Sequence, residues 1–304
     1  MRRDRNQAWD NHPDGPLFCI VFHPGSVLLA TGDAIGAVKI WDTASRGPFA
    51  VLRGHQGAVW SVAFSPDGES LASGGRDGTI RLWEVAGGRR WHTIEPEEEM
   101  VWSVAYAPDG RTLAAGGASG NVRLFDVASG RPIAVLEGNG RPVPALAFAP
   151  DGAHLASGGE DGLVMLWDVA APGARTVLQG HGGGVNSVAF SPDGSIIASA
   201  SDDMNVMLWN RTTGKLAGVL RGHCGLVEDL AFAPDGRRLA SAGQDGAVLL
   251  WDLNTRQVEA EWKDHTGAVW SVAFAPDGRC LATAGEDGLI MRMELVENTV
   301  PAEA

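Results

Sequence analysis

The stretches GAVWSVAFSPDG (residues 57–68) and GAVWSVAFAPDG (residues 267–278) differ at one position and begin 210 residues apart. Near-identity over such a distance is typical of internal repetition, and the period of the repeat then indicates the architecture. The Pro-Asp-Gly tripeptide that ends both stretches is a turn signal, so each copy is expected to be a strand followed by a tight turn.

The chain repeats with a period of 42 residues. Pro-Asp-Gly occurs at residues 66–68, 108–110, 150–152, 192–194, 234–236 and 276–278, and the first unit has His-Pro-Gly-Ser at 23–26. A bulky apolar residue directly before an acidic residue or Asn follows the same period: Trp41, Trp83, Phe125, Trp167, Trp209, Trp251 and Met293. A Gly-His step recurs at 54–55, 180–181 and 222–223, with Asp264-His265 as a variant.

Each unit is predicted to contain four short strands. In the second unit these are residues 58–65, 70–75, 79–85 and 89–95, separated by Pro-Asp-Gly, Arg-Asp-Gly and Ala-Gly-Gly. The strands are apolar almost throughout rather than alternating, which is typical of sheets that are covered on both faces. Seven such sheets stacked face to face around an axis would bury both faces of each.

The recurring Gly-His, Ser-Pro-Asp-Gly, Leu-Ala-Ser-Gly-Gly, Asp-Gly and Leu-Trp-Asp elements resemble the WD-repeat family, over all seven units. The resemblance implies an all-β fold: a single seven-bladed β-propeller of four-stranded antiparallel blades. The expected segments are a closing strand (5–12), blade one (13–53), blade two (54–95), blade three (96–137), blade four (138–179), blade five (180–221), blade six (222–263), blade seven (264–296) and a tail (297–304).

The N-terminus is expected to close the ring. The last unit ends after its third strand, at residues 289–296, whereas residues 5–12 (RNQAWDNH) fit the fourth-strand pattern. Pairing of these two segments within blade seven would remove an exposed strand edge.

Two registers of the closing strand are open. One places His12 at the Gly-His position, with Pro13 as an extra residue in the following loop, and the gap-free alignment places Pro13 there instead. The first is preferred because Trp9 then takes an apolar position that other blades fill with leucine. These leucines are Leu52, Leu136 and Leu178.

Ser, His and Asp recur together at fixed spacing, which raises the question of a hydrolase triad. The copies are His55, Ser73, Asp77 and Trp83; His181, Ser199, Asp203 and Trp209; His223, Ser241, Asp245 and Trp251; and His265, Thr283 and Asp287, with Met293 in place of Trp. An active site does not usually recur around a ring. The family resemblance implies a structural network, in which Asp holds His, His meets the hydroxyl and the hydroxyl meets the indole N–H. Removing one partner would cost about 1–3 kcal/mol.

Three units depart from this set. Unit one has Thr31, Ile35 and Trp41; unit three has Glu97, Ala115, Ser119 and Phe125; unit four has Asn139 in place of His but keeps Ser157, Asp161 and Trp167. Blades one and three are therefore expected to depend more on apolar packing.

The resemblance places the Gly-His loops and the loops between second and third strands on one rim, where related propellers commonly dock peptides. One residue of each first strand is expected to point into the channel mouth: Phe18, Trp60, Trp102, Pro144, Asn186, Glu228 and Trp270. Because units seven and one are neighbours in a closed ring, four of these residues form an aromatic crescent: Trp270, Phe18, Trp60 and Trp102. Large aromatic side chains are frequent energetic anchors in protein interfaces.

The other part of the rim is polar. Besides Asn186 and Glu228, this part is expected to include residues of the loops before the third strands: Glu160, Asp202, Gln244 and Glu286. Arg76 is the basic exception and lies on the aromatic side. We predict that a protein or peptide partner with apolar and basic side chains contacts Phe18, Trp60, Arg76, Trp102, Glu228 and Trp270. The alternative for each tryptophan is packing against the neighbouring blade.

Composition limits the function classes. The 304-residue chain has a formal net charge of −13, so neither nucleic acid nor an anionic membrane surface is an expected partner. Three cysteines without regular spacing favour a reducing compartment and give no metal or cofactor site. No apolar run approaches 18 residues and no signal sequence is recognised, so a cytoplasmic location is expected. Arg outnumbers Lys 21 to 3, which favours a bacterial source.

We therefore predict a non-catalytic protein-interaction scaffold that is monomeric alone and carries no cofactor. Two alternatives remain: a recently duplicated or engineered repeat propeller without a specific ligand, and a propeller enzyme with a site in the channel mouth, because fold does not determine function. An isolated pair of polar residues with shifted pKa values at the mouth would favour the enzyme.

Overall fold

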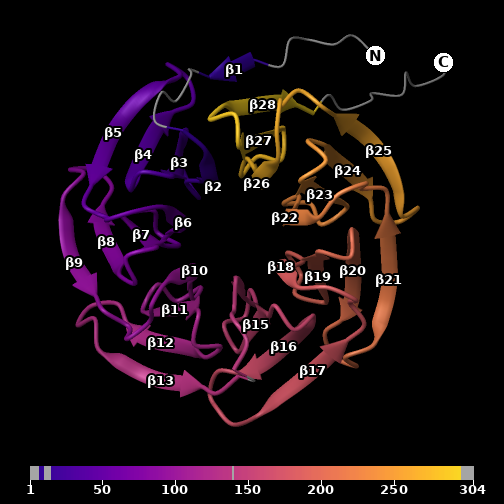
Figure 1. The fold of residues 1–304 in the computed structure, drawn as a ribbon, viewed down its shortest axis with the longest axis horizontal. Helices are drawn as coiled ribbons and strands as arrows, with labels where there is room; N and C mark the ends of the chain where they lie inside the picture. Colours follow the sequence, from indigo (N-terminus) through magenta and orange to yellow (C-terminus); the bar gives the residue numbers. More distant parts are fainter. Residues whose placement is uncertain (1–6, 10–14, 139, 296–304) are drawn as a thin grey trace, which may run out of the picture.

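A computed structural model of the chain describes residues 7–9, 15–138 and 140–295. Over these ranges the chain forms β-strands and turns without a helix. The strands make seven four-stranded antiparallel sheets, which stand as blades around a central axis (Figure 1). This arrangement confirms the all-β, seven-bladed propeller that the 42-residue period predicts.

The strands of a blade follow one another from the axis outward. The innermost strands are β2 (Leu17–Phe22), β6 (Val59–Phe64), β10 (Val101–Tyr106), β14 (Ala145–Phe148), β18 (Val185–Phe190), β22 (Val227–Phe232) and β26 (Val269–Phe274). The second strands are β3 (Leu28–Asp33), β7 (Ser70–Gly75), β11 (Thr112–Gly117), β15 (His154–Gly158), β19 (Ile196–Ser201), β23 (Arg238–Gly243) and β27 (Cys280–Gly285).

The outer half of each blade completes the sheet. The third strands are β4 (Ala37–Asp42), β8 (Ile80–Glu84), β12 (Val122–Asp126), β16 (Leu163–Asp168), β20 (Asn205–Asn210), β24 (Val248–Asp252) and β28 (Ile290–Glu294). The outermost strands are β5 (Gly47–Arg53), β9 (Arg90–Ile94), β13 (Pro132–Leu136), β17 (Arg175–Gln179), β21 (Leu216–Arg221), β25 (Gln257–Trp262) and, for the last blade, β1 (Gln7–Trp9).

Blade seven takes its outermost strand from the other end of the chain. β1 pairs with β28 in antiparallel orientation, with Trp9 opposite Ile290. The corresponding pair in blade one is Leu52 opposite Val38, so the backbone register places Trp9 at the leucine position of the other blades. The choice between His and Pro at the Gly-His position falls on residues 10–14, which lie outside the described residues.

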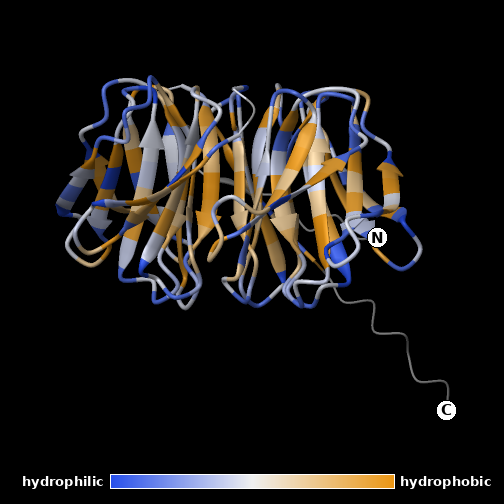
Figure 2. Cartoon of the chain, turned by 90° about the horizontal axis from the view of Figure 1, so that it is seen from below, coloured by the Kyte–Doolittle hydropathy of each residue, from blue (hydrophilic) through white to orange (hydrophobic). Residues whose placement is uncertain are grey.

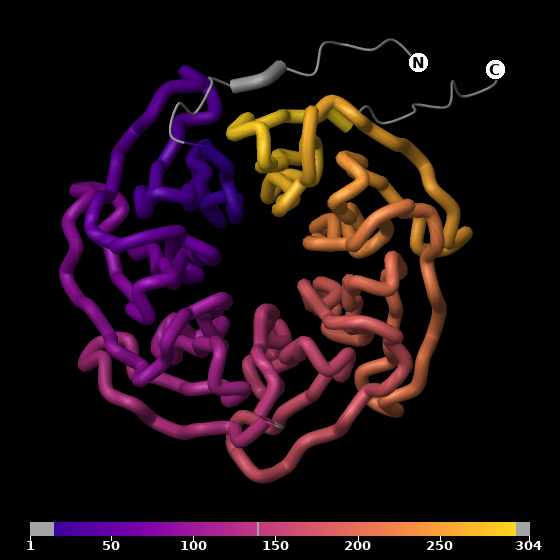
Figure 3. Tube along the Cα trace, viewed as in Figure 1, coloured from indigo at the N-terminus to yellow at the C-terminus, as the bar shows by residue number. Residues whose placement is uncertain are grey.

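Blades one and seven are neighbours because the chain runs once around the ring (Figure 3). Their facing sides share one buried apolar cluster, to which blade one contributes Leu17 and Trp41 and blade seven contributes Ala282 and Ile290. Residues far apart in the sequence are thereby held together at this interface.

Packing between blades forms the core. Within the described residues, each of the seven interfaces between neighbouring blades has its own cluster of buried apolar side chains. Between blades one and two, for example, the cluster includes Val38, Ile40, Leu71 and Trp83. Figure 2 shows hydrophobic segments along the strands and hydrophilic residues at the turns of both faces of the disc. Each fully buried aliphatic side chain contributes about 1.5–3 kcal/mol, so most of the folding free energy resides at these interfaces.

The Pro-Asp-Gly turns join the first and second strands of the blades. In blade two the Asp67 carboxylate accepts a hydrogen bond from the Glu69 N–H at 2.9 Å, and the Gly68 N–H donates to the Ser65 carbonyl at 2.8 Å. Gly68 has a φ of +74°, which residues with a Cβ adopt only at a cost. This geometry accounts for the recurrence of the tripeptide.

Removing residues 1–9 is expected to destabilise the ring, because β28 would become an open strand edge. We expect a lower unfolding temperature and more self-association than in the full chain, measured by calorimetry and size-exclusion chromatography. A chain that lacks only residues 1–5 keeps β1 and serves as the matched control. Equal unfolding temperatures for the two truncated chains would contradict a closing role for β1.

Candidate functional site

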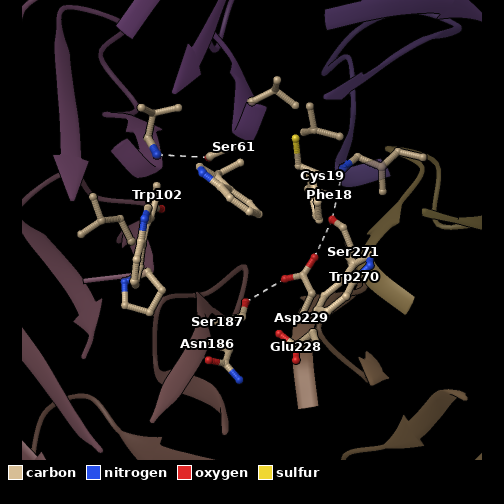
Figure 4. A pocket seen from close by; sticks show the side chains of 18 of the residues that line it. Phe18, Cys19, Ser61, Trp102, Asn186, Ser187, Glu228, Asp229, Trp270 and Ser271 are labelled. Carbon is tan, nitrogen blue, oxygen red and sulfur yellow. Dashed lines mark hydrogen bonds between the residues drawn. The ribbon is translucent and has the colours of Figure 1, made fainter. Parts of the chain in front are cut away.

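The inner strands surround a cavity of about 600 Å³ in the central channel. One residue from the corresponding position of every blade lines it: Phe18, Trp60, Trp102, Pro144, Asn186, Glu228 and Trp270. Figure 4 shows Phe18, Trp102 and Trp270 around the same space as the polar residues Asn186 and Glu228. The position inferred from the repeat therefore faces the channel in all seven blades.

β-Bulges turn these side chains toward the axis. In blade three, Val101 and Ser103 pair with adjacent residues of β11, so Trp102 between them has no partner in the ladder. The pairing shifts in the same way at Phe18, Trp60, Asn186, Glu228 and Trp270. A bulged residue leaves the regular alternation of the strand, which redirects its side chain. Pro144 differs because it directly precedes β14.

Phe18 lies at the centre of the aromatic crescent. Its ring centroid is 4.5 Å from that of Trp60 and 6.0 Å from that of Trp270, with the ring planes tilted. Trp102 lines the cavity farther along, beside Met100. All four crescent residues are half-buried, so each ring packs against its surroundings and also forms part of the cavity wall.

The indole N–H groups of Trp60 and Trp270 are buried and have no hydrogen-bond partner among the described residues. A buried donor without a partner costs about 1–3 kcal/mol. Such groups are uncommon in folded proteins, and each one requires an explanation. Here both belong to the crescent.

Hydrogen bonds hold the polar side chains of the cavity wall. The Asn186 amide donates to Asp202 at 2.8 Å and to the Val227 carbonyl at 3.2 Å. The Gln244 amide donates to Glu228 Oε1 at 2.7 Å. Burial raises the pKa of Glu228 to about 6; the hydrogen bond from Gln244 acts in the opposite direction, and the nearby carboxylates of Asp202 and Asp229 contribute to the rise.

Arg76 does not line the cavity. Its side chain is exposed and its methylene groups lie against Gly57 in the Gly-His loop. The structure therefore brings together five of the six residues predicted to contact a partner, and Arg76 lies outside the cavity.

Asp229 is a hydrogen-bonded residue of the channel wall that was not among the residues predicted from the sequence. Its carboxylate accepts hydrogen bonds from the hydroxyls of Ser187, at 2.8 Å, and Ser271, at 2.7 Å, and from the N–H groups of Val272 and Leu230, at 3.0 and 2.8 Å. It thus ties blade six to blades five and seven. The sequence does mark this residue: at the equivalent position, 42 residues apart, four other blades have serine where blade six has aspartate. These serines are Ser61, Ser103, Ser187 and Ser271.

The recurring His-Ser-Asp-Trp set forms hydrogen-bonded chains. In blade two, His55 Nε2 lies 2.7 Å from Ser73 Oγ and His55 Nδ1 lies 2.9 Å from Asp77, while the Trp83 indole N–H donates to Ser73 Oγ at 2.8 Å. The ionised Asp77 carboxylate can only accept, so His55 carries a proton on Nδ1, and in the neutral imidazole Nε2 then accepts the Ser73 hydroxyl.

The other copies repeat this geometry. His181, Ser199, Asp203 and Trp209 form the chain in blade five, and His223, Ser241, Asp245 and Trp251 form it in blade six. Blade seven has the bonds between His265 and Thr283, at 2.8 Å, and between His265 and Asp287, at 2.9 Å.

These chains are structural. The hydroxyl oxygens of Ser73, Ser199 and Ser241 accept an indole N–H, and the three residues have no exposed surface. A nucleophilic serine needs an accessible lone pair and a substrate beside it, which this geometry does not provide.

Blade three uses a different polar cluster. Glu98, one residue beyond the histidine position, accepts hydrogen bonds from the Ser119 N–H at 3.0 Å and from the Ser119 hydroxyl, and its carboxylate lies 3.3 Å from Arg123. Blade three thus lacks the His-Ser-Asp-Trp network, as expected, but has polar contacts of its own beside its apolar packing. In blade one the Trp41 indole donates to Thr31 at 2.9 Å. Asn139 of blade four lies outside the described residues.

Two further findings concern the part of the chain that the structure describes. No group of three or more His, Cys, Asp or Glu residues is placed to hold a metal ion there. Nor do those residues include a helix of the length and apolarity needed to cross a bilayer.

Ser73→Ala is expected to cost about 1–3 kcal/mol for each of the two groups it leaves without a partner, the Trp83 indole and His55 Nε2. Thr283→Val is the matched control, since it leaves only His265 Nε2 unpaired, with Met293 at the tryptophan position. Urea unfolding measures both. A smaller loss for Ser73→Ala than for Thr283→Val would contradict the network.

The free energy of unfolding is expected to fall as the pH drops below about 6.5, the ordinary histidine value. Burial lowers the pKa values of His55 and His223 despite their aspartate partners, so the folded state takes up fewer protons than the unfolded state in this range. Urea midpoints measured between about pH 5 and pH 8 test this. A His55→Asn, His223→Asn variant should be less stable at pH 8 and should lose less free energy of unfolding between pH 8 and pH 5. If its stability changes with pH as steeply as that of the parent, the two histidines are not the cause.

Comparison with known proteins agrees with this geometry. The family model described as WD domain, G-beta repeat matches residues 4–42, 46–84, 88–126, 130–168, 174–210, 214–252 and 256–291. The second matched segment begins at β5, the outermost strand of blade one, and ends in β8 of blade two, so each repeat joins two neighbouring blades. A search of curated proteins found no match. Because the family model covers most of its length, the chain belongs to the WD-repeat family of β-propellers.

Proposed function

We propose that this protein is a non-catalytic scaffold that docks a peptide or loop of a partner protein at the mouth of its central channel, with Phe18, Trp60, Trp102 and Trp270 as anchors. Propellers of this family are commonly protein-interaction scaffolds. The observation that carries the proposal is the half-buried aromatic wall of a cavity of about 600 Å³. Aromatic residues that are partly exposed in a concave site are frequent anchors of protein interfaces.

The unpaired indole N–H groups of Trp60 and Trp270 support a binding role. Backbone carbonyl groups of a bound segment could accept hydrogen bonds from these indoles once the rings turn, which would offset the cost of leaving the donors unpaired. Structural tryptophans of the same chain, such as Trp83 and Trp209, have their N–H groups bonded within the blade.

The charge of the chain supports a partner with basic as well as apolar character. The formal net charge is −13, and the polar part of the cavity wall includes the carboxylate of Glu228. Complementary charge accelerates association and disfavours acidic competitors. All three cysteines are free thiols, which supports a reducing, cytoplasmic setting for the interaction.

The enzymatic alternative has less support. Glu228 and Asp229 are adjacent carboxylates with raised pKa values at the channel, which is the kind of pair that would favour it. However, Asp229 already receives four hydrogen bonds that join three blades, so one carboxylate rather than a pair is open to a ligand. Glu228 is therefore part of a binding surface in the function proposed here.

A Trp60→Ala, Trp102→Ala variant is expected to lose partner capture while it retains its fold. Affinity capture from the source proteome with mass spectrometry, beside circular dichroism and thermal unfolding, measures both properties. Only proteins that bind saturably to the parent chain are counted.

The matched control is Trp91→Ala, Trp262→Ala, which removes two tryptophans from the outer strands β9 and β25. This variant should keep the captured partners. Normal capture by the channel variant would contradict the docking site, as would equal losses in both variants. No saturable partner for the parent chain would favour a duplicated or engineered propeller without a specific ligand.

A further inference from the structure

The charged side chains that line the cavity, among the described residues, are all acidic. The described residues that line it include Glu228 and Asp229 but no lysine, arginine or histidine. The other lining residues are apolar, aromatic, hydroxyl, amide or, at Cys19, thiol side chains. A cationic group entering this space would meet carboxylates and aromatic faces, and no basic side chain of the wall would repel it.

The two carboxylates differ in what they already bind. Asp229 receives four hydrogen bonds, two from serine hydroxyls and two from backbone N–H groups, and both of its oxygens are engaged. Among the described residues, Glu228 receives a hydrogen bond on Oε1 from the Gln244 amide. Glu228 is also the bulged residue of β22, which turns its side chain toward the channel. Of the pair, Glu228 is therefore the carboxylate that can take a new partner.

The surroundings of Glu228 make its ionised form unfavourable when no counter-ion is present. Burial raises its pKa to about 6, and the carboxylates of Asp202 and Asp229 act in the same direction. A carboxylate that is partly removed from water gains more from a nearby cation than an exposed one does. The neighbouring bulged residue on β26 is Trp270, which contacts Phe18, so an apolar stem could lie beside the carboxylate.

We infer that Glu228 is the counter-ion for one cationic side chain that the docked segment inserts into the channel. The stem of that side chain lies along Phe18 and Trp270, and its charged end reaches Glu228. This inference rests on the proposed docking function and names the chemistry of the inserted residue, a lysine or an arginine.

Capture then depends on pH. Binding of a cation favours the ionised carboxylate, so affinity falls as Glu228 becomes protonated. With its pKa at about 6, most of the carboxylate is ionised at pH 7.5 and about a tenth at pH 5. Affinity for a cationic ligand should therefore fall about tenfold over this interval. The groups that face Glu228 are Gln244, Asp202 and Asp229, and none of them supplies a positive charge.

The test uses Nα-acetyl-arginine amide and Nα-acetyl-lysine amide as probes, with Nα-acetyl-norleucine amide as the neutral control. Each is titrated to the limit of its solubility while the indole N–H signals are followed by NMR. Trp→Phe variants assign the signals of Trp60, Trp102 and Trp270. We expect a cationic probe to shift the Trp270 signal with an affinity about tenfold lower at pH 5 than at pH 7.5, and the neutral probe to bind more weakly at pH 7.5.

Glu228→Gln should weaken cation binding at pH 7.5 to the level of the parent at pH 5 or below, because no ionised fraction remains, and should abolish the pH dependence. Glu160→Gln is the matched control, because it removes an exposed rim carboxylate outside the cavity and should keep the tenfold change. The inference is overturned if neither cation shifts the channel indoles, or if Glu228→Gln binds like the parent.

The two proposals fail separately. If the probes do not bind but the Trp60→Ala, Trp102→Ala variant still loses its captured partner, docking stands and the role of Glu228 is wrong. If capture is unaffected by the loss of both tryptophans, the docking function is wrong whatever the probes do.

Discussion

Each sheet of this protein is apolar on both faces, and burial of those faces requires a neighbour on each side. A row of such sheets would leave two apolar faces in water, whereas a ring leaves none. The shared cluster of Leu17, Trp41, Ala282 and Ile290 at the interface of blades one and seven meets this requirement. The same closure places the ring centroids of Phe18 and Trp270 6.0 Å apart. The aromatic crescent is therefore a direct consequence of ring closure, which buries the outer faces of blades one and seven.

The channel wall results from a second, local constraint. The innermost strands are crowded near the axis, and a β-bulge in six of the blades sets one residue outside the hydrogen-bonded ladder. That residue carries no ladder pairing, so its side chain can vary without a change in the pairing of its neighbours. Residues next to the bulge are constrained, since Ser61 Oγ accepts the Val104 N–H and Asp229 joins three blades. The residues of the proposed docking site and the residues that join the blades thus occupy adjacent positions of one strand.

The fold and the channel-facing position were predictable because both depend on periodicity, which a single sequence displays seven times. The bonds of Ser73 with His55 and Trp83 were expected from the family resemblance that the repeated motifs carry. Departures from the period were not. Glu98 takes over a polar role one residue away from the repeat position, and the exposed Arg76 lies away from the cavity although its loop is on the rim. Such outcomes depend on side-chain conformation and burial, which spacing does not encode.

Positions that repeat from blade to blade and positions that vary differ in their physical role. The Ser-His-Asp network gives buried hydrogen-bond donors between turn and strand a partner in several blades. Because this requirement is the same in each of these blades, the network recurs with little change. The bulged position has no such need, yet it divides the ring into an aromatic arc and a polar arc with a carboxylate of raised pKa. A symmetric scaffold would present a ligand with seven similar edges. The asymmetry of this one position gives the channel a defined orientation, and in the proposed docking site the groups that differ from blade to blade are the ones that would distinguish one orientation of a segment from another.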